Sequence, residues 1–421
     1  MHLACPVPKF AHMSDIHIGA FRQPELRALV LDAFDSAMDR CIREKVSFII
    51  MAGDIFDSNI PDLSSVRRAA EKMKEAIDAG IRIYAIYGSH DFSPNFSSIV
   101  DVLDGAGLFT KAEDRDTRRE RMTLHFVHDP SGVKICGLSG KKLSLDIEEY
   151  AELDRAPLEQ EPGFKIFVFH GGIDELKPPT LDMMPAMPAS FLPSGFAYYA
   201  GGHVHYRLLK SLPGRQNIAY PGPLFATDYA ELLELARGEQ RGFYLVDFDR
   251  NGVKETEFVP VKVAGVTEVY YSAEGKTPIQ VTEDLLKKAA NPNLAGKIVL
   301  LTVDGQLGSG KTSDVGFQAI RRRFADARPL VMLPKFGLTS KELATPPSPP
   351  RGLPLVEREL FERGIAGVRT EEPGLKGEKG VAVAIELLRT LKEPKKENEN
   401  RSEFEERTAQ AGLGIFGLKE N

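Results

Sequence analysis

The chain has no tryptophan, only three cysteines and no apolar run long enough to cross a membrane. The cysteines, Cys5, Cys41 and Cys136, lack C-x-x-C spacing, so we expect reduced, structural thiols rather than a disulfide framework or a thiolate metal site. A bilayer span needs roughly 20 apolar residues. The first apolar segment follows the N-terminus at once, which leaves no room for a signal peptide. We therefore expect a cytoplasmic protein with no membrane partner.

An excess of positive charge is also missing. The chain has 54 Lys and Arg against 60 Asp and Glu, for a formal net charge of -6. This balance argues against a protein that coats nucleic acid by charge alone, but metal ions and local basic clusters can still hold a phosphate backbone. Net charge therefore neither indicates nor excludes DNA. A length of 421 residues is too long for one core and predicts two or three domains.

Five short apolar runs stand out because each ends in histidine or aspartate. They span residues 10–17, 48–57, 81–91, 164–170 and 196–205. Each begins like a buried strand. Between the first three runs, residues 24–45 and 63–79 have the apolar spacing of helices, which predicts crossovers between three parallel strands. Ligands bind beyond the carboxyl ends of strands in open α/β sheets, so the polar tails should meet at one site.

These tails offer the side chains of a two-metal phosphodiesterase centre. Imidazole and carboxylate suit Mn, Fe or Zn. Two such ions about 3.5–4 Å apart can clamp the attacking and leaving oxygens of a phosphoryl displacement. Asp54 is the expected bridge. The expected ligands are Asp15, His17 and His205 for one ion, and His170 and His203 for the other.

His90 remains for transition-state charge or for protonation of the leaving oxygen. Its neighbour Asp91 is expected to fix the tautomer of the His90 ring. A single histidine is more often structural than catalytic. Five buried runs that each end in histidine or aspartate are not explained by chance.

The rest of the chain predicts attachments to this first domain, which we place at residues 1–249. Residues 253–340 alternate short strands and helices, which predicts a small α+β domain. A proline-rich linker covers 341–354. The tail, 355–421, contains two expected helices, at 355–363 and 380–392, and an apolar, glycine-containing segment at 411–418 on a flexible frame. Such a tail buries itself poorly, which favours a partner surface.

The motifs resemble those of the calcineurin-like metallophosphoesterase superfamily over roughly residues 10–248. They are Asp15-Ile16-His17, Gly53-Asp54-Ile55-Phe56-Asp57, Gly88-Ser89-His90-Asp91, His170 and Gly202-His203-Val204-His205. With Tyr220-Pro221-Gly222 and the attachments, the chain more narrowly resembles the nuclease subunit of double-strand-break repair complexes, the archaeal relatives of bacterial SbcD.

This resemblance implies an α/β fold, a four-layer α/β/β/α sandwich with a small α+β capping domain that contacts DNA and a helical C-terminal tail. It implies a manganese-dependent DNA exonuclease and endonuclease. It further implies a homodimer through nuclease-domain helices and a C-terminal segment that binds an SbcC-type, SMC-like ATPase.

Two positions depart from the family pattern. Ser89 stands where the superfamily usually has an asparagine that ligates the second ion; we expect weaker binding there, and the alternative that Ser89 only fits the turn stays open. Asp57 stands where many repair relatives have a histidine that helps steer DNA, so we interpret it as a variation in substrate handling.

Residues 305–312 fit the nucleotide-binding pattern G-x-x-x-x-G-K-T. The domain is too short for a parallel NTPase sheet and offers no second acidic strand end for magnesium. We therefore interpret the motif as a turn of the capping domain, in which Lys311 and Arg321 contact phosphates.

Two other functions use the same motifs. One is a metallophosphoesterase that acts on a smaller phosphoester or a phosphoprotein. The other is a scaffold that keeps the fold without the chemistry, for which Ser89 is the only support. The additional domain and the tail favour a macromolecular substrate.

Overall fold

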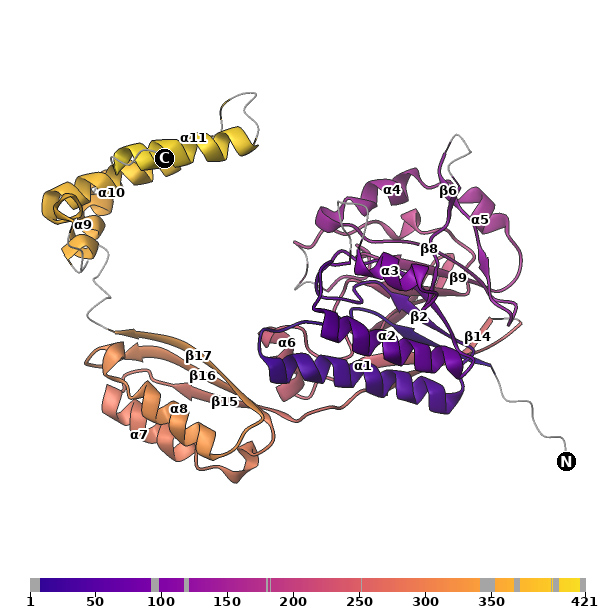
Figure 1. Cartoon of the computed structure of the whole chain (residues 1–421), viewed down its shortest axis with the longest axis horizontal. Helices are drawn as coiled ribbons and strands as arrows, with labels where there is room; N and C mark the ends of the chain where they lie inside the picture. The colour runs from indigo at the N-terminus through magenta and orange to yellow at the C-terminus, as the bar shows by residue number, and fades with distance from the viewer. Residues whose placement is uncertain are drawn as a thin grey trace. The chain divides into compact units, whose positions relative to one another are not determined.

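The computed structural model describes residues 8–91, 98–116, 121–178, 181, 183–250, 252–340, 353–366, 372–394, 396 and 401–416. They fall into two compact units that divide after Ser340, and each is described by itself (Figure 1). Most of the expected linker at 341–354 lies outside the described residues, as does Cys5; Cys41 and Cys136 are free and buried. None of the described helices combines the length and apolar character that a membrane span requires.

The first sheet has six strands in the order β14-β13-β1-β2-β3-β4. They span Lys9–Met13 (β1), Phe48–Ala52 (β2), Arg82–Ile86 (β3), Thr110–Lys111 (β4), Gly242–Asp249 (β13) and Gly252–Pro260 (β14). Strands β1, β2 and β3 are parallel, as the helical crossovers predict. Those crossovers are α1 (Pro24–Glu44) and α2 (Leu63–Asp78), and the shorter α3 (Ile99–Gly105) follows β3.

The second sheet has the order β11-β12-β10-β9-β8-β7. Its strands span Val127–His128 (β7), Lys134–Leu138 (β8), Lys165–His170 (β9), Tyr198–Gly202 (β10), Leu208–Leu212 (β11) and Arg215–Tyr220 (β12). Strands β8, β9 and β10 are parallel. Helices α4 (Asp146–Glu152) and α5 (Ala156–Gln160) precede β9, and α6 (Tyr229–Ala236) follows β12. A two-stranded ribbon, β5 (Arg115–Asp116) with β6 (Thr123–Leu124), is separate.

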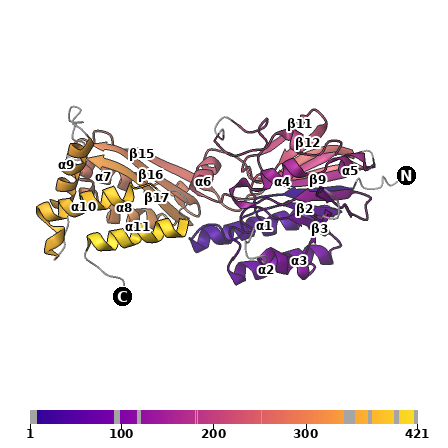
Figure 2. The ribbon, with the colours of Figure 1, turned by 90° about the horizontal axis from the view of Figure 1, so that it is seen from above.

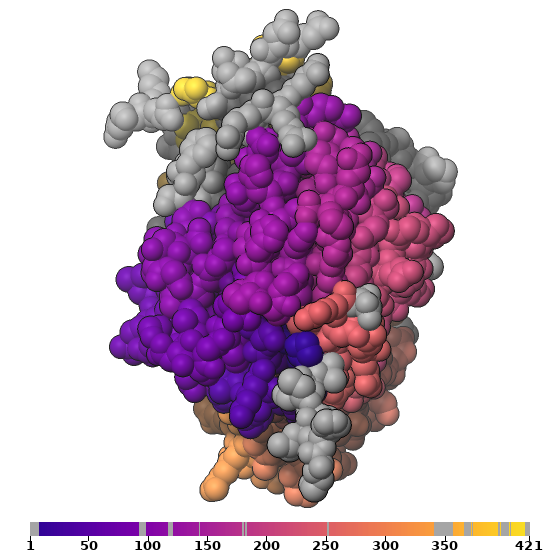
Figure 3. Space-filling view, turned by 90° about the vertical axis from the view of Figure 1, so that its right-hand side faces the viewer, coloured from indigo at the N-terminus to yellow at the C-terminus, as the bar shows by residue number. Residues whose placement is uncertain are grey.

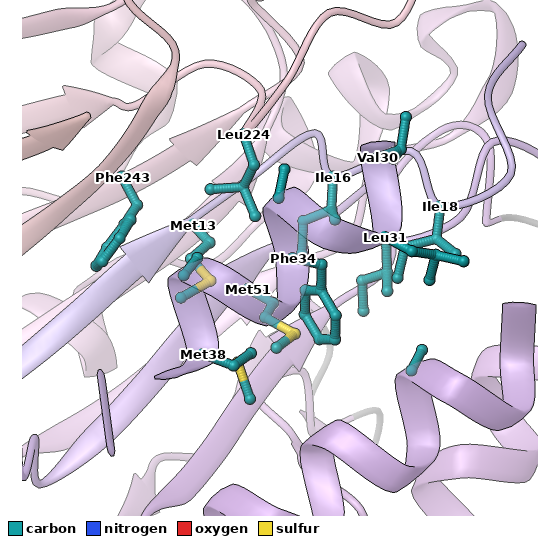
Figure 4. Packing of buried hydrophobic residues seen from close by; sticks show 14 of the residues in the cluster. Met13, Ile16, Ile18, Val30, Leu31, Phe34, Met38, Met51, Leu224 and Phe243 are labelled. Carbon is teal, nitrogen blue, oxygen red and sulfur yellow. The ribbon is translucent and has the colours of Figure 1, made fainter. Parts of the chain in front are cut away.

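Alternation along β2 explains the layers. Phe48 and Ile50 pack into the core between the two sheets, whereas Ile49 and Met51 pack toward the helices. On the helix side, side chains of β1, β2 and α1 interlock around Phe34 (Figure 4). A third core covers the outer face of the second sheet, against α4 and α5.

These layers make the predicted four-layer α/β/β/α sandwich. Figure 2 shows α1 and α2 on one side of β2 and β3, with β9 and β12 on the other. Figure 3 shows one face of the molecule, where the first hundred residues, indigo to purple, adjoin later residues in magenta and pink. The first sheet combines strands from the start of the domain with β13 and β14 from its end, and the second sheet comes from the residues between them.

The first sheet extends beyond the predicted boundary at residue 249. Strand β14 pairs antiparallel with β13 along its whole length, because the chain turns back at Asp249–Gly252 to make a hairpin. The small α+β part follows, with the parallel sheet β15 (Val266–Ser272), β16 (Ile298–Leu307) and β17 (Val331–Ser340). Its helices are α7 (Pro278–Lys288) and α8 (Phe317–Asp326).

The second unit is helical, with α9 (Leu353–Ala366), α10 (Gly377–Leu391) and α11 (Arg401–Ile415). The expectation of a flexible frame at 411–418 was wrong for its first part, since Ala411–Ile415 form the last turn of α11. The preceding residues include the good helix formers Glu, Arg, Ala and Gln, and a helix that has already formed can extend through the two glycines although each costs about 1 kcal/mol relative to alanine. Gly417 and Leu418 lie outside the described residues.

Candidate metal centre

The site lies where β1, β2, β3, β9 and β10 end. The loops after β1, β2, β3 and β10 carry Asp15 and His17, Asp54, Ser89 and His90, and His203 and His205, respectively, and His170 is the last residue of β9. His90 is exposed, and Ser89, His203 and His205 are partly buried. The other four side chains are buried. Segments far apart in the chain therefore place their polar groups in one region, as expected for the carboxyl ends of parallel strands.

The first group of facing side chains is Asp15, His17 and His205. One ligand atom from each lies within 4.8 Å of the others. His17 Nε2 is 3.2 Å from His205 Nε2, and His205 Nε2 is 3.8 Å from Asp15 Oδ1. These are the three residues that the sequence assigned to one ion.

The second group is Asp15, Asp54 and His170, again within 4.8 Å. Asp54 Oδ2 is 3.1 Å from His170 Nε2 and 3.8 Å from His17 Nε2. Asp54 thus faces an imidazole of each expected ion set. This is the position that a bridging carboxylate requires.

The backbone at these residues is unusual. Asp15, His17, Asp54 and His203 have φ angles of 52°, 50°, 50° and 91°. Positive φ is uncommon outside glycine, and residues held there cluster at functional sites. At Gly53, φ is 85°, and a Cβ would overlap His170 Nδ1 and lie 2.9 Å from Gly88 Cα. Only glycine lets the chain turn here while Asp54 enters the site.

Two of the imidazoles are oriented through Nδ1. His170 Nδ1 donates to the Ala52 carbonyl at 2.8 Å, and His205 Nδ1 donates to Glu231 Oε1 at 2.7 Å. In a neutral ring, Nε2 then carries the lone pair, and in both rings Nε2 faces the carboxylates. This is how proteins commonly prepare histidine for a metal ion.

The charges of the site affect its pKa values. Burial alone would lower the pKa of His170, but the Asp54 carboxylate outweighs it and raises that pKa to about 10. Burial also opposes the Glu231 carboxylate at His205, whose pKa rises to about 9. Although burial would raise the pKa of Asp54, the facing imidazoles His170 and His17 hold it far below its usual range.

The donor set fits divalent cations. His170 Nε2 is buried and has no hydrogen-bond partner of acceptable geometry among the described residues. His17 Nε2 and His205 Nε2 face each other, and two neutral lone pairs repel unless a proton or a cation lies between them. Buried carboxylate and imidazole groups without thiolate suit borderline or hard divalent ions. That these side chains ligate ions stays a prediction.

The other two predicted ligands of the second ion lie beside this group. His203 donates its backbone N–H to Asp15 Oδ1 at 2.8 Å, and its ring centroid is 5.3 Å from that of His170. Burial and the His170 charge lower the pKa of His203 to about 4. Ser89 Oγ donates to Asp54 Oδ2 at 3.4 Å. Both residues are therefore near the expected ion, and their ligation stays a prediction.

His90 lies within reach of the same carboxylate, in a third group with His17 and Asp54. Its backbone N–H donates to Asp54 Oδ1 at 2.7 Å, and its Nδ1 contacts the Asp57 carbonyl at 2.8 Å. Its ring is exposed and meets that of His17 edge to face, with centroids 4.8 Å apart. Exposure leaves Nε2 accessible to a substrate.

Asp91 differs from the expectation. Its buried carboxylate accepts backbone N–H bonds from Ile55, Phe56 and Gly88 at 3.0–3.1 Å, which ties the loop after β3 to the loop after β2. The orientation of His90 comes instead from Asp57. Asp91 follows His90 in the chain, but its side chain turns inward because three orphan backbone donors need an acceptor there.

Asp57 was expected to act in substrate handling. Its Oδ1 is 3.3 Å from His17 Nδ1, and this contact lowers the pKa of Asp57. The side chain therefore lies against a predicted ligand and its carbonyl against His90. Contact with a substrate stays a prediction.

Lys311 and Arg321 do not join these groups. Both side chains are exposed in the small α+β part, Lys311 before a 3-10 turn at Thr312–Asp314 and Arg321 on α8. In a nucleotide-binding loop the helix opens at the Lys-Thr pair. Here α8 begins only at Phe317, in agreement with a turn.

Sequence reasoning missed Glu231. Its carboxylate contacts His205, yet no motif announced it, because it belongs to a helix outside the five blocks. One signal was present: Asp228 and Glu231 have the spacing of a helix-capping box. Such a pattern marks a helix start and gives no hint of a metal site.

A cavity of about 400 Å³ opens beside the ligands. It is lined by Pro178, Leu181, Met184, His203, Val204, His205, Tyr206, Glu231 and Glu234. Pro178, Leu181 and Met184 of the proline-rich segment at 177–193 thus contribute one wall. A substrate has room next to His203 and His205.

Residues 8–207 match the family model of calcineurin-like phosphoesterases. Proteins named DNA double-strand break repair protein Mre11 are similar. That of Methanopyrus kandleri is 27% identical over 261 residues, 60% of this chain and 57% of that protein. That of Archaeoglobus fulgidus is 25% identical over 281 residues, 62% and 61% of the two chains.

The same-named protein of Sulfurisphaera tokodaii is 29% identical over 249 residues, 56% of this chain and 59% of that protein. The chain thus matches about three fifths of the length of these relatives. A dimetal phosphatase from Danio rerio has a TM-score of 0.34 and 12% identity, covering 61% of this chain and 100% of its own. The matched segment, residues 8–207, contains all five motifs in full, so this part of the chain is similar to the calcineurin-like phosphoesterases.

Proposed function

We propose that the chain is a two-metal, manganese-dependent DNA phosphodiesterase that acts as an exonuclease and an endonuclease on DNA ends in double-strand-break repair. The observation that carries the proposal is the position of Asp54, whose carboxylate faces His17 of one ligand group and His170 of the other. A pair of bound ions supplies the positive charge that stabilises the attacking and leaving oxygens of a phosphodiester.

The chain's own residues hold and orient the groups. Ala52 and Glu231 fix the rings of His170 and His205 through Nδ1. In its imidazolium form, with Nδ1–H held by the Asp57 carbonyl, His90 would present Nε2–H to the leaving oxygen and give it that proton. In this assignment His90 is the catalytic residue, and Asp57 and Asp91 position the loops.

Three observations favour DNA as the substrate. The relatives named above are DNA break-repair proteins by name. The small part at 253–340 carries exposed Lys311 and Arg321, which suit phosphate contacts of a capping domain. The 400 Å³ cavity beside His203 and His205 leaves room for a nucleotide next to the site.

The partners belong to the same proposal. The helical unit from residue 355 binds an SbcC-type, SMC-like ATPase, for which the half-exposed apolar face of α10 and the exposed Leu360 on α9 are candidates. Two copies pair through helices of the nuclease domain. The complex works in the cytoplasm.

The test compares three substrates with purified chain and Mn²⁺: end-labelled duplex DNA, bis-p-nitrophenyl phosphate and a phosphopeptide. Labels at the 5′ and 3′ ends separate exonuclease from endonuclease products. We expect the chain to cleave DNA, and to cleave it faster in complex with the SbcC-type ATPase. Turnover of the phosphopeptide alone would instead favour the phosphoprotein alternative.

His90→Ala provides the matched control. Loss of a positioned general acid costs typically 10²–10⁴-fold in rate. The variant should keep DNA binding and metal binding, since its side chain is exposed and the Asp54 contact comes from the backbone. Cleavage at the wild-type rate would contradict the role of His90, and no cleavage by wild type would support the scaffold alternative.

A further inference from the structure

Helix α6 has two faces with different contacts. Asp228 caps its N-terminus by accepting from the Glu231 N–H at 2.9 Å. Glu231 then projects toward the metal centre, although it is only 7% exposed. A buried carboxylate needs partners to offset its loss of hydration. Its partners therefore indicate its role.

Both oxygens of Glu231 accept hydrogen bonds. Oε1 accepts from His205 Nδ1 at 2.7 Å, and Oε2 accepts from Thr227 N at 2.7 Å and Thr227 Oγ1 at 3.0 Å. The backbone of His205 is also held, because its carbonyl accepts from the buried guanidinium of Arg241. Ring and backbone of one predicted ligand are thus fixed by this corner of the molecule.

The chemistry of the carboxylate decides the tautomer. An ionised Glu is acceptor-only, so the His205 nitrogen that faces it must carry the proton. In the neutral ring, Nε2 is then unprotonated, and Nε2 is the atom near Asp15 and His17. The opposite tautomer would place N–H where an ion must bind.

The other face of α6 rests on the small sheet. Tyr229 Oη is 3.1 Å from Thr302 Oγ1 on β16, Lys335 Nζ of β17 lies 5.7 Å from the Tyr229 ring centre, and Arg237 is 3.6 Å from Glu268 on β15. Ile298 and Leu300 of β16 join the core of the first sheet. The helix that carries Glu231 is therefore anchored on the side away from His205.

We propose that Glu231 is a positioning residue for the metal centre, which holds His205 in the tautomer that can ligate the first ion, from a helix anchored by the β15–β17 sheet. The inference rests on the proposed function, because it requires that the chain bind two ions. It assigns a role to a residue outside the five motifs. Groups that orient a ligating histidine typically contribute 10–100-fold to metal affinity.

Glu231→Gln is the decisive variant. Glutamine has one oxygen and one NH₂ in place of two acceptors. If the oxygen keeps the bond from the Thr227 N–H, the NH₂ faces His205 Nδ1 and selects the wrong tautomer. The side chain at position 231 then still accepts the hydrogen bond from Thr227, but His205 is no longer held in the tautomer that can ligate an ion. Glu239→Gln makes the same chemical change at an exposed residue beyond the end of α6.

The measurement is Mn²⁺ binding to the full chain by calorimetry, with free Mn²⁺ counted by electron paramagnetic resonance, and thermal unfolding in EDTA. We expect wild type and Glu239→Gln to bind two ions alike. Glu231→Gln should bind one ion about 10–100-fold more weakly and the other as wild type. Glu231→Ala should lose the same affinity and also unfold earlier, because it leaves Thr227 N–H unpaired.

The outcomes separate this inference from the proposed function. Two ions bound with wild-type affinity by both Glu231 variants would overturn the inference and leave the metal centre intact. A lowered midpoint in EDTA with unchanged Mn²⁺ affinity would show a purely structural role and also overturn it. A wild-type chain that binds no Mn²⁺ would overturn the proposed function, and the inference with it.

Discussion

The loop after β2 and the segment at the end of β16 both place glycine and charged residues beyond a buried parallel strand. Gly53 to Asp57 meets four other strand ends, and its carboxylates contact His17, His90 and His170. Gly305 to Thr312 meets no such group among the described residues, and Lys311 is exposed. Both sequence patterns suggest a binding site. Only the loop after β2 is surrounded by other strand ends that carry polar side chains.

The comparison teaches that a motif becomes a site when separate elements converge on it. At the loop after β2, positive φ angles, a glycine with no room for a Cβ, and oriented imidazoles all occur together. At the end of β16, the glycine-rich pattern is used for a close approach between Gly308 and Gly275 and for a turn. One arrangement costs stability and is held in place by many contacts, whereas the other is an ordinary connection.

The largest effect is expected from Asp54→Asn in the loop after β2. The amide keeps the shape but removes the charge that faces His17 and His170, and it places an NH₂ toward cations or imidazoles. We expect Mn²⁺ binding to weaken at both sites and DNA cleavage to fall by at least about 10³-fold, as for loss of a bridging group in two-metal catalysis. Calorimetry and end-labelled DNA digestion provide the measurement. Two ions bound at wild-type affinity would exclude Asp54 as the bridge.

A second, large effect is the pH dependence of metal affinity. In the metal-free chain the pKa of His170 is raised to about 10 and that of His205 to about 9. Below those values both rings are protonated and cannot ligate, so each of the two ions must displace one proton. Apparent affinity should therefore rise with pH, by up to about 100-fold per unit for the pair of ions together near pH 7, and level off above about 10. Affinity that is flat from pH 6 to pH 9 would contradict this assignment.

Ser89→Asn tests whether the residue at position 89 ligates the second ion. The serine hydroxyl donates to Asp54 and is too short to match the amide oxygen expected at this position. Asparagine should tighten the second ion by roughly 10-fold, the lower end of what an oriented ligand contributes. The readout is the Mn²⁺ concentration for half-maximal nuclease activity, with a matched Ser64→Asn on the exposed start of α2 as the control. An unchanged titration would leave Ser89 as a turn residue.

His12 lies in the same strand as the site but has a different kind of environment. It is fully buried between the sheets, with Nδ1 3.0 Å from Tyr198 Oη, and burial lowers its pKa to about 3. As pH falls below the unfolded value of about 6.5, the unfolded chain takes up a proton that the folded chain cannot, so stability is lost on the acid side. His12 should account for about 1.4 kcal/mol of unfolding free energy per pH unit below that value.

His12→Gln keeps an acceptor for Tyr198 and removes the titrating ring. Its unfolding free energy, measured in urea between pH 4.5 and pH 7.5 in EDTA, should fall less steeply with acid than that of wild type. The exposed His128→Gln is the control. Parallel curves for His12→Gln and wild type would show that other groups govern the acid side.

Sequence patterns were sufficient for the layers and for the convergence of the motifs, because both follow from local regularities. Short continuous apolar runs separated by segments with helical spacing predict parallel strands with crossovers, and the carboxyl ends of such strands share an edge. The role of Asp91 did not follow, because its partners are the backbone N–H groups of Ile55, Phe56 and Gly88, which no side-chain pattern encodes. Glu231 did not follow either, since its contact with His205 joins two elements through tertiary packing. Strand β14 lies beyond the predicted boundary because its pairing with β13, rather than a feature of its own sequence, joins it to the first sheet.

The smallest effect is expected from Lys311→Ala, which tests whether the glycine-rich segment at the end of β16 is a turn or a binding site. If the end of β16 is a turn, removal of one exposed ammonium group should leave ATP binding undetectable in both proteins and weaken DNA binding by no more than a few-fold. Loss of a single phosphate contact reduces the salt slope of binding by about one. Calorimetry with ATP and a salt titration of DNA binding measure the two effects, with Lys276→Ala as an equally exposed control. Micromolar ATP affinity that disappears in Lys311→Ala would mean that the glycine-rich segment is a second site, and that convergence of several strand ends is not required for one.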